Sequence, residues 1–185
     1  MLREPFYPIE FTEIGPDILY TRFLREDLCS LILNTCLSIN TWSRNPRLPY
    51  HTDDIHFEKD LPNWKDLLET GLSKALEGAC EHWGVEDDVS IASIFAIRYT
   101  LETSTNLKQH HDDSYISGSI KLNGDYTGGL LNFPKQNFNN QYMGIGDLIL
   151  WPGQLTHPHE SKPISSGEKY SITIWTKNES LENHR

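Results

Sequence analysis

The chain has 185 residues, of which 37% are hydrophobic and 11% aromatic. The composition is too apolar for a disordered chain, and the length predicts one folded domain over residues 1–185. A formal net charge of −10 argues against a nucleic-acid partner, because phosphates require clustered Lys and Arg. No apolar run approaches the roughly 18 residues of a membrane span, and the first residues lack the apolar stretch of a signal peptide. We therefore expect a cytoplasmic protein without membrane contact.

Two helices are predicted in the first half of the chain, within a helical part over about residues 15–88. The first runs from Phe23 to about residue 39, and the second begins at Pro62 and ends before Gly84. Apolar residues recur at helical spacing in both, and Pro at the start with Gly at the end is typical of helix termini. The three cysteines show no disulfide pattern and fit a reducing compartment: Cys29, Cys36 and Cys80.

Strands and turns dominate from residue 89 onward. Residues 89–99 (VSIASIFAIRY) predict a strand buried on both faces, and LLNF, GDLILWP and KYSITIWT predict further short strands. The polar end, 177–185, is predicted to fray. Two helices followed by many short strands indicate an α+β domain, with helices packed on a β-sandwich or barrel over about residues 89–177.

Histidines and carboxylates occur at spacings that suit a metal. An iron site of the 2-His-1-carboxylate type needs a His and an acid two residues apart on a strand, with a second His from elsewhere. Because the chain has 8 histidines, such pairs also arise by chance. The chain contains four His-x-acid pairs: His51/Asp53, His56/Glu58, His110/Asp112 and His111/Asp113.

Strand parity favours His110 and Asp112 among these pairs. If the strand is continuous, both residues share a face with the apolar even-numbered positions that follow, and His111 and Asp113 lie on the other face. The second histidine is then His157 or His159, which flank Pro158. The apolar even-numbered positions are Ile116, Gly118, Ile120 and Leu122.

A cation and a hydroxyl follow the distal histidines. Lys169 and Ser171 are two residues apart on a predicted strand, so an ammonium and a hydroxyl point the same way. Such a pair suits the terminal carboxylate of a dicarboxylic acid.

Four segments together resemble a known family. They are HTDDIHFEKD (51–60), LKQHHDDSYISGSIKLN (107–123), DYTGG (125–129) and WPGQLTHPHESKPISSGEKYSITIW (151–175). They resemble the iron(II)- and 2-oxoglutarate-dependent dioxygenases of the prolyl and lysyl hydroxylase type, above all the catalytic domain of procollagen lysyl hydroxylases, over about residues 15–177. The resemblance implies a double-stranded β-helix of the jelly-roll or cupin kind, with N-terminal helices packed on the major sheet. It also implies iron(II), 2-oxoglutarate and oxygen, and makes ascorbate a candidate further cofactor.

The resemblance also implies roles for individual residues. In this family the second histidine precedes the basic residue by ten positions, which selects His159, because Lys169 lies ten residues later. Lys169 and Ser171 would then bind the far carboxylate of 2-oxoglutarate, and Tyr99 would lie near it. The animal lysyl enzymes carry an arginine at the position of Lys169, whereas prolyl 4-hydroxylases carry a lysine. Iron would be held by His110, Asp112 and His159.

The sequence indicates the substrate-binding residues less directly than the iron ligands. The candidates either bind substrate or stabilise turns, and they are Asp53, Asp54, His56 and Asp113. The first functional hypothesis is hydroxylation of a lysyl side chain in a peptide or protein. Alternatives are a free amino acid or small biosynthetic peptide as substrate, and a sensor that binds iron and 2-oxoglutarate without turnover. Whether the chain forms a homodimer stays open.

Overall fold

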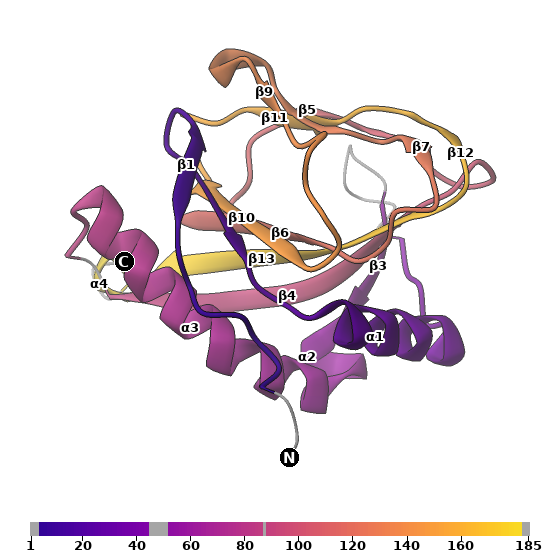
Figure 1. Ribbon diagram of the computed structural model, residues 1–185, viewed down its shortest axis with the longest axis horizontal. Helices are drawn as coiled ribbons and strands as arrows, with labels where there is room; N and C mark the ends of the chain where they lie inside the picture. The colour runs from indigo at the N-terminus through magenta and orange to yellow at the C-terminus, as the bar shows by residue number, and fades with distance from the viewer. Residues whose placement is uncertain (1–3, 45–51, 87, 183–185) are drawn as a thin grey trace.

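The computed structural model describes residues 4–44, 52–86 and 88–182. Two antiparallel sheets lie one above the other, and helices cover the outer face of the larger one (Figure 1). In spatial order the larger sheet contains β1 (Thr12–Gly15), β2 (Ile18–Arg22), β10 (Asp147–Pro152), β6 (Ile116–Lys121), β13 (Lys169–Asn178), β4 (Val89–Tyr99) and β3 (Asp53–His56). This arrangement is the double-stranded β-helix that the family resemblance implies.

The smaller sheet closes the opposite side. Its order is β5 (Leu107–His110), β11 (His159–Ser161), β8 (Leu131–Phe133) and β9 (Phe138–Asn139), and a separate pair joins β12 (Ile164–Ser166) to β7 (Thr127–Gly128). The helices are α1 (Glu26–Ile39), α2 (Phe57–Asp60), α3 (Pro62–Trp83) and α4 (Glu179–Glu182), with a 3-10 turn at Pro134–Gln136. No helix in the described part of the chain is long and apolar enough to cross a membrane.

The two predicted helices are present. Helix α3 begins at Pro62 and is followed by Gly84, whose φ of +64° is the left-handed conformation that glycine adopts at little cost. Helix α1 begins at Glu26 rather than at Phe23, because the chain is still leaving strand β2 there. Phe23 is fully buried in the core all the same.

The main core lies between the helices and the larger sheet. Ile172 and Ile174 of β13 and Ile120 of β6 are fully buried against the helices, together with Leu68 and Leu72 of α3. Each such aliphatic side chain contributes roughly 1.5–3 kcal/mol when it leaves water. Because side chains alternate along a strand, the other face of β13 is directed toward the smaller sheet and is available for a site.

Two expectations about secondary structure, one for residues 15–88 and one for the C-terminal segment, were wrong. The part over residues 15–88 is not only helical, because β1, β2 and β3 join the larger sheet and β2 pairs with the distant strand β10. The polar C-terminal segment forms the end of β13 and the helix α4 (Glu179–Glu182), and residues 183–185 lie outside the described part of the chain. Strand β13 pairs with β4 up to Asn178, which lies opposite Val89, and these ladder hydrogen bonds stabilise a segment whose composition predicted fraying.

Candidate metal centre

Three side chains from two segments converge at one end of the space between the sheets. Nε2 of His110 lies 3.4 Å from Oδ1 of Asp112, and Nε2 of His159 lies 3.5 Å from Oδ2 of the same carboxylate. The potential ligand atoms of the three residues all lie within 4.8 Å of one another. Strands β5 and β11 place the histidines, because His159 is the direct cross-strand partner of His110.

Backbone carbonyls fix both imidazole rings. Nδ1 of His110 is hydrogen-bonded to the carbonyl oxygen of Lys108 at 2.8 Å, and Nδ1 of His159 to that of His157 at 3.0 Å. These bonds assign the proton to Nδ1 and leave Nε2 of each ring as the ligand atom, the usual arrangement at metal sites. The backbone N–H of Asp112 donates to the carbonyl oxygen of Gly153 at 3.1 Å, which holds the carboxylate between the rings.

The protonation states also suit a divalent metal. Burial raises the pKa of Asp112, but the hydrogen bond to His110 and the neighbouring imidazoles outweigh burial, so its pKa lies below the usual range. Burial lowers the pKa of His159, which favours the neutral imidazole. Oδ2 of Asp112 is buried without a hydrogen-bond partner among the described residues, and a cation would satisfy it. Burial lowers the pKa of His110, but the hydrogen bonds to Asp112 and to the Lys108 carbonyl outweigh burial and raise it. Two imidazoles and one carboxylate are the donor set that fits iron(II).

The neighbouring histidines lie differently. Nε2 of His157 is 2.9 Å from the carbonyl oxygen of Pro16, and its Nδ1 is 2.9 Å from Oγ1 of Thr156, so both ring nitrogens are engaged away from the three proposed ligands. His111 is exposed, although it lines the same cavity as His110. The geometry therefore agrees with the choice of His159 over His157.

The parity prediction that selected His110 and Asp112 was wrong in its reasoning. The strand is not continuous: β5 ends at His110 in the smaller sheet, and β6 begins at Ile116 in the larger one. The even-numbered residues Ile116 and Ile120 pack against the helices, away from the cavity, whereas Ser119 and Lys121 of the opposite face line it. His110 and Asp112 reach the cavity because the chain changes sheets between them and β6.

A cavity of about 400 Å³ extends from the three ligands between the sheets. That volume lies within the usual range for small-molecule sites, roughly 300–1,000 Å³. Apolar atoms form most of its wall surface, although many of the lining residues carry polar groups. The lining includes Phe95, Ile97, Tyr99, Leu107, Tyr126, Leu131, Trp151, Lys169, Ser171, Thr173 and Trp175.

Lys169 is a buried cation on this lining. It is 6% exposed, and its ammonium donates to the carbonyl oxygen of Gly129 at 2.7 Å and to Oγ of Ser161 at 2.9 Å. No ion pair joins it to an acid in the described part of the chain, and burial lowers its pKa to about 7. Ser171 lies on the same face of β13, as predicted, and lines the cavity. A buried charge is costly unless it is paired, so an anionic ligand in the cavity would stabilise this ammonium.

Tyr99 is the cross-strand neighbour of Lys169. The ammonium nitrogen lies 4.9 Å from the centre of the Tyr99 ring, within range of a cation–π contact, and Tyr99 is buried. Sequence reasoning missed Ser161, which contacts the lysine and lies two residues after His159 on β11. The two-residue spacing from a proposed ligand was a signal that could have found it.

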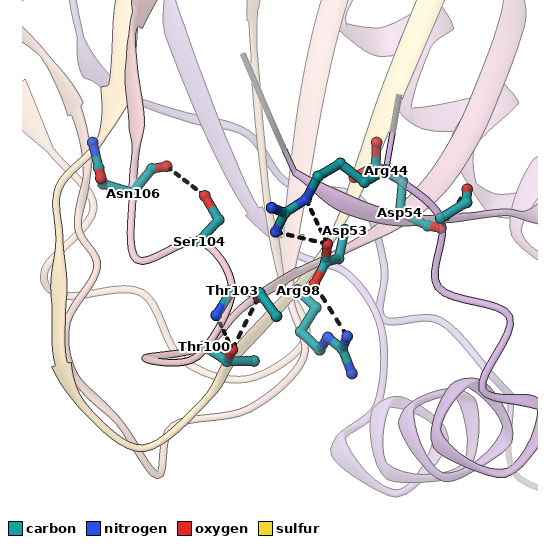
Figure 2. Close-up of polar contacts among 9 residues, drawn as sticks. Arg44, Asp53, Asp54, Arg98, Thr100, Thr103, Ser104 and Asn106 are labelled. Carbon is teal, nitrogen blue, oxygen red and sulfur yellow. Dashed lines mark hydrogen bonds and ion pairs between the residues drawn. The ribbon is translucent and has the colours of Figure 1, made fainter. Parts of the chain in front are cut away.

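Of the four candidate substrate residues, three line the cavity and one, Asp53, does not. Asp53 forms ion pairs with Arg44 at 3.0 Å and with Arg98 at 3.1 Å, and it does not line the cavity. Figure 2 shows its carboxylate between the two guanidinium groups, with Asp54 extending away from them. The prediction of a substrate role for Asp53 is therefore corrected: side chains alternate along β3, and Asp53 points to the side opposite Asp54. His51, the partner of Asp53 in one His-x-acid pair, lies outside the described residues.

Asp54, His56 and Asp113 do line the cavity. Burial raises the pKa of Asp54 to about 6, and the ring of His56 stacks on Phe95 at 5.3 Å. Asp113 is exposed. Besides Asp112, the cavity wall thus presents two acidic groups: Asp54 on β3, and Asp113 directly after that proposed ligand.

Comparisons with known proteins agree with this geometry. No family model matches the chain. Procollagen-lysine,2-oxoglutarate 5-dioxygenase 1 of Rattus norvegicus is 29% identical over 169 residues, covering 89% of this chain and 22% of the relative. The multifunctional procollagen lysine hydroxylase and glycosyltransferase of Caenorhabditis elegans is 24% identical over 186 residues, covering 91% of this chain and 25% of the relative. The chain thus spans about a quarter of the length of these relatives.

Solved structures share the fold. A viral collagen prolyl hydroxylase from Paramecium bursaria Chlorella virus-1, solved as a 2-oxoglutarate complex, gives a TM-score of 0.69 at 17% identity, covering 88% of this chain and 96% of that one. A Pseudomonas putida prolyl-4-hydroxylase gives 0.65 at 18% identity, covering 88% and 92%. The chain is therefore similar in sequence to procollagen lysyl hydroxylases and similar in fold to prolyl hydroxylases. The resemblance that the sequence motifs predicted to this type of 2-oxoglutarate and iron(II) oxygenase is confirmed, and so is the fold.

Proposed function

We propose that the chain is an iron(II)- and 2-oxoglutarate-dependent hydroxylase. The observation that carries the proposal is the convergence of two imidazole Nε2 atoms and one carboxylate at the end of a cavity that also holds a buried ammonium. Oxygen would be the oxidant: bound iron(II) would activate it, 2-oxoglutarate would supply two electrons by oxidative decarboxylation, and the C–H bond of the substrate would supply the other two. The protein supplies binding and orientation. 2-Oxoglutarate, oxygen and iron(II) are all required by this chemistry.

Different residues of this chain would bind iron, bind 2-oxoglutarate and exclude water. His110, Asp112 and His159 would hold iron from one side, which leaves the rest of its coordination sphere open to the cavity. Lys169 and Ser171 would bind the far carboxylate of 2-oxoglutarate, with the charge of Lys169 as the main attraction. The aromatic walls keep water from the reacting atoms, which protects the oxidation from side reactions.

For the substrate we propose a lysyl side chain in a peptide or protein. Two facts support it. The sequence relatives are lysyl hydroxylases by name, and the cavity wall carries the carboxylate of Asp54, with the exposed carboxylate of Asp113 beside the metal centre. Both carboxylates lie where they could attract an ammonium group. His56, stacked on Phe95, would then contribute to the wall against which the alkyl chain packs. A free amino acid or a small peptide is the alternative substrate.

A panel of substrates tests this proposal. Peptides containing lysine, proline, asparagine or arginine, and the free amino acids, are incubated with the protein, iron(II), 2-oxoglutarate and oxygen. We expect a lysyl peptide to gain one oxygen by mass spectrometry and to stimulate succinate formation. Oxidation of a different substrate, with every lysyl peptide inert, would contradict the substrate proposal alone. Binding of iron and 2-oxoglutarate without any succinate would instead indicate a sensor.

A further inference from the structure

The ammonium of Lys169 is held by two groups from separate parts of the chain. Its Nζ donates to the carbonyl oxygen of Gly129 at 2.7 Å and to Oγ of Ser161 at 2.9 Å. An ammonium has three N–H donors, so these two bonds leave one for a ligand in the cavity. Lysine has a long flexible stem and a point charge, so its partners determine where the charge lies.

Gly129 accommodates the stem of this lysine. Its φ is +65°, and a Cβ atom there would lie 3.1 Å from Cδ of Lys169 and 2.8 Å from Cγ2 of Ile164. A side chain at this position would therefore collide with its neighbours. The glycine lets the backbone carbonyl approach the ammonium from one side, and the second contact must come from elsewhere.

Ser161 provides that second contact and joins three strands. It is 4% exposed, lies on β11 two residues after His159, and lines the same cavity as that histidine. Its hydroxyl contacts Lys169 at the start of β13 and is also a hydrogen-bond partner of the Tyr99 phenol at the end of β4. A single hydroxyl thus links the strand of a proposed iron ligand to the strands that carry the cation and its aromatic neighbour.

We propose that Ser161 is a positioning residue for the co-substrate. It fixes the ammonium of Lys169 at one depth in the cavity, and thereby sets both the affinity for 2-oxoglutarate and the length of dicarboxylate that reaches from iron to the cation. This inference rests on the proposed function, because it assigns Lys169 to the far carboxylate. Without the hydroxyl, the ammonium keeps only its bond to Gly129 and can move along the cavity.

A double-mutant cycle of affinities for 2-oxoglutarate tests the proposed role of Ser161. Affinity for 2-oxoglutarate is measured by calorimetry, anaerobically with iron(II), for the native protein, Ser161→Ala, Lys169→Met and the double variant. Loss of a hydrogen bond to a charged group costs roughly tenfold or more in affinity, so we expect that loss in Ser161→Ala. In the Lys169→Met background the same change should have no further effect, because Ser161 acts through the lysine. Ser165→Ala removes an exposed hydroxyl outside the cavity and is the matched control.

Two further readouts separate positioning from a general structural role. At saturating 2-oxoglutarate, Ser161→Ala should keep kcat within about twofold while the KM for 2-oxoglutarate rises by the same roughly tenfold. The preference for 2-oxoglutarate over 2-oxoadipate, one carbon longer, should also shrink. Unchanged affinity in Ser161→Ala, or an equal loss in both backgrounds, would overturn the inference. Absence of 2-oxoglutarate binding by the native protein would instead overturn the proposed function.

Discussion

The affinity for 2-oxoglutarate should fall as the pH rises above neutrality, because the cation that binds it is easily deprotonated. Burial lowers the pKa of Lys169 to about 7 in the free protein, and Lys121 adds a like charge nearby. A bound carboxylate stabilises the ammonium, so the pKa of Lys169 rises in the complex. Above pH 7 the free protein holds a neutral amine, and binding must take up a proton. Because binding takes up a proton, the affinity for 2-oxoglutarate must decrease as the pH rises.

The size of the effect follows from that pKa. A single group that must be protonated weakens binding by nearly tenfold per pH unit above its pKa, so the dissociation constant should rise by roughly tenfold between pH 7 and pH 8.5. The same calorimetric titration, repeated in buffers of different ionisation enthalpy, should show uptake of nearly one proton at pH 8. The metal must be saturating throughout, so that titration of His110 and His159 does not contribute.

Lys169→Arg is the matched control. A guanidinium stays charged across this range, so this variant should bind 2-oxoglutarate with little pH dependence and without proton uptake. A dissociation constant that stays constant between pH 7 and pH 8.5 in the native protein would refute the reasoning. So would an equal pH dependence in native protein and Lys169→Arg, because the titrating group would then lie elsewhere.

Three further predictions concern the ligands, the substrate and stability. His159→Ala should lose most bound iron in metal analysis, whereas His157→Ala should retain it, because both nitrogens of His157 are already hydrogen-bonded away from the centre; the reverse result would contradict the ligand choice. Asp54→Asn should raise the KM for a lysyl peptide by roughly tenfold or more, with the KM for 2-oxoglutarate unchanged, and an unaltered peptide KM would exclude Asp54 from recognition. Lys169→Met should raise the free energy of unfolding without ligand, by up to roughly 5 kcal/mol at pH 7, because the pKa shift from 10.5 to about 7 measures the cost of burying the charge; a destabilised variant in denaturant titrations would contradict this.

The sequence predicted the elements that are marked by residues within the element itself, such as helix α3. The spacing of apolar residues defined α3 to the residue, and Pro62 and Gly84 marked its ends. The short strands β1 and β2 were missed because β2 pairs with β10, more than 120 residues later in the chain, and β1 joins the sheet only through β2. Composition also misjudged the C-terminal segment, where pairing between Asn178 and Val89 overrides polarity.

The candidate site was predicted in part for the wrong reason. Strand parity pointed to His110 and Asp112, but the chain leaves one sheet after His110 and enters the other at Ile116, and no local pattern marks that change. Parity did separate Asp54 from Asp53 in the structure, although the sequence offered both as substrate residues. The role of Asp53 depends on two arginines, one of them 45 residues away, which only the fold brings together.

The most direct test of the account is the balance of oxygen and 2-oxoglutarate. Purified protein is supplied with iron(II), 2-oxoglutarate and a lysyl peptide, and oxygen consumption, succinate and hydroxylated peptide are measured together. We predict one succinate and one hydroxylated peptide for each oxygen molecule consumed, dependent on iron and abolished in Asp112→Ala, which lacks the carboxylate between the two imidazoles. Native protein that retains iron and 2-oxoglutarate but forms no succinate with any substrate, or an Asp112→Ala variant with native turnover, would contradict the account.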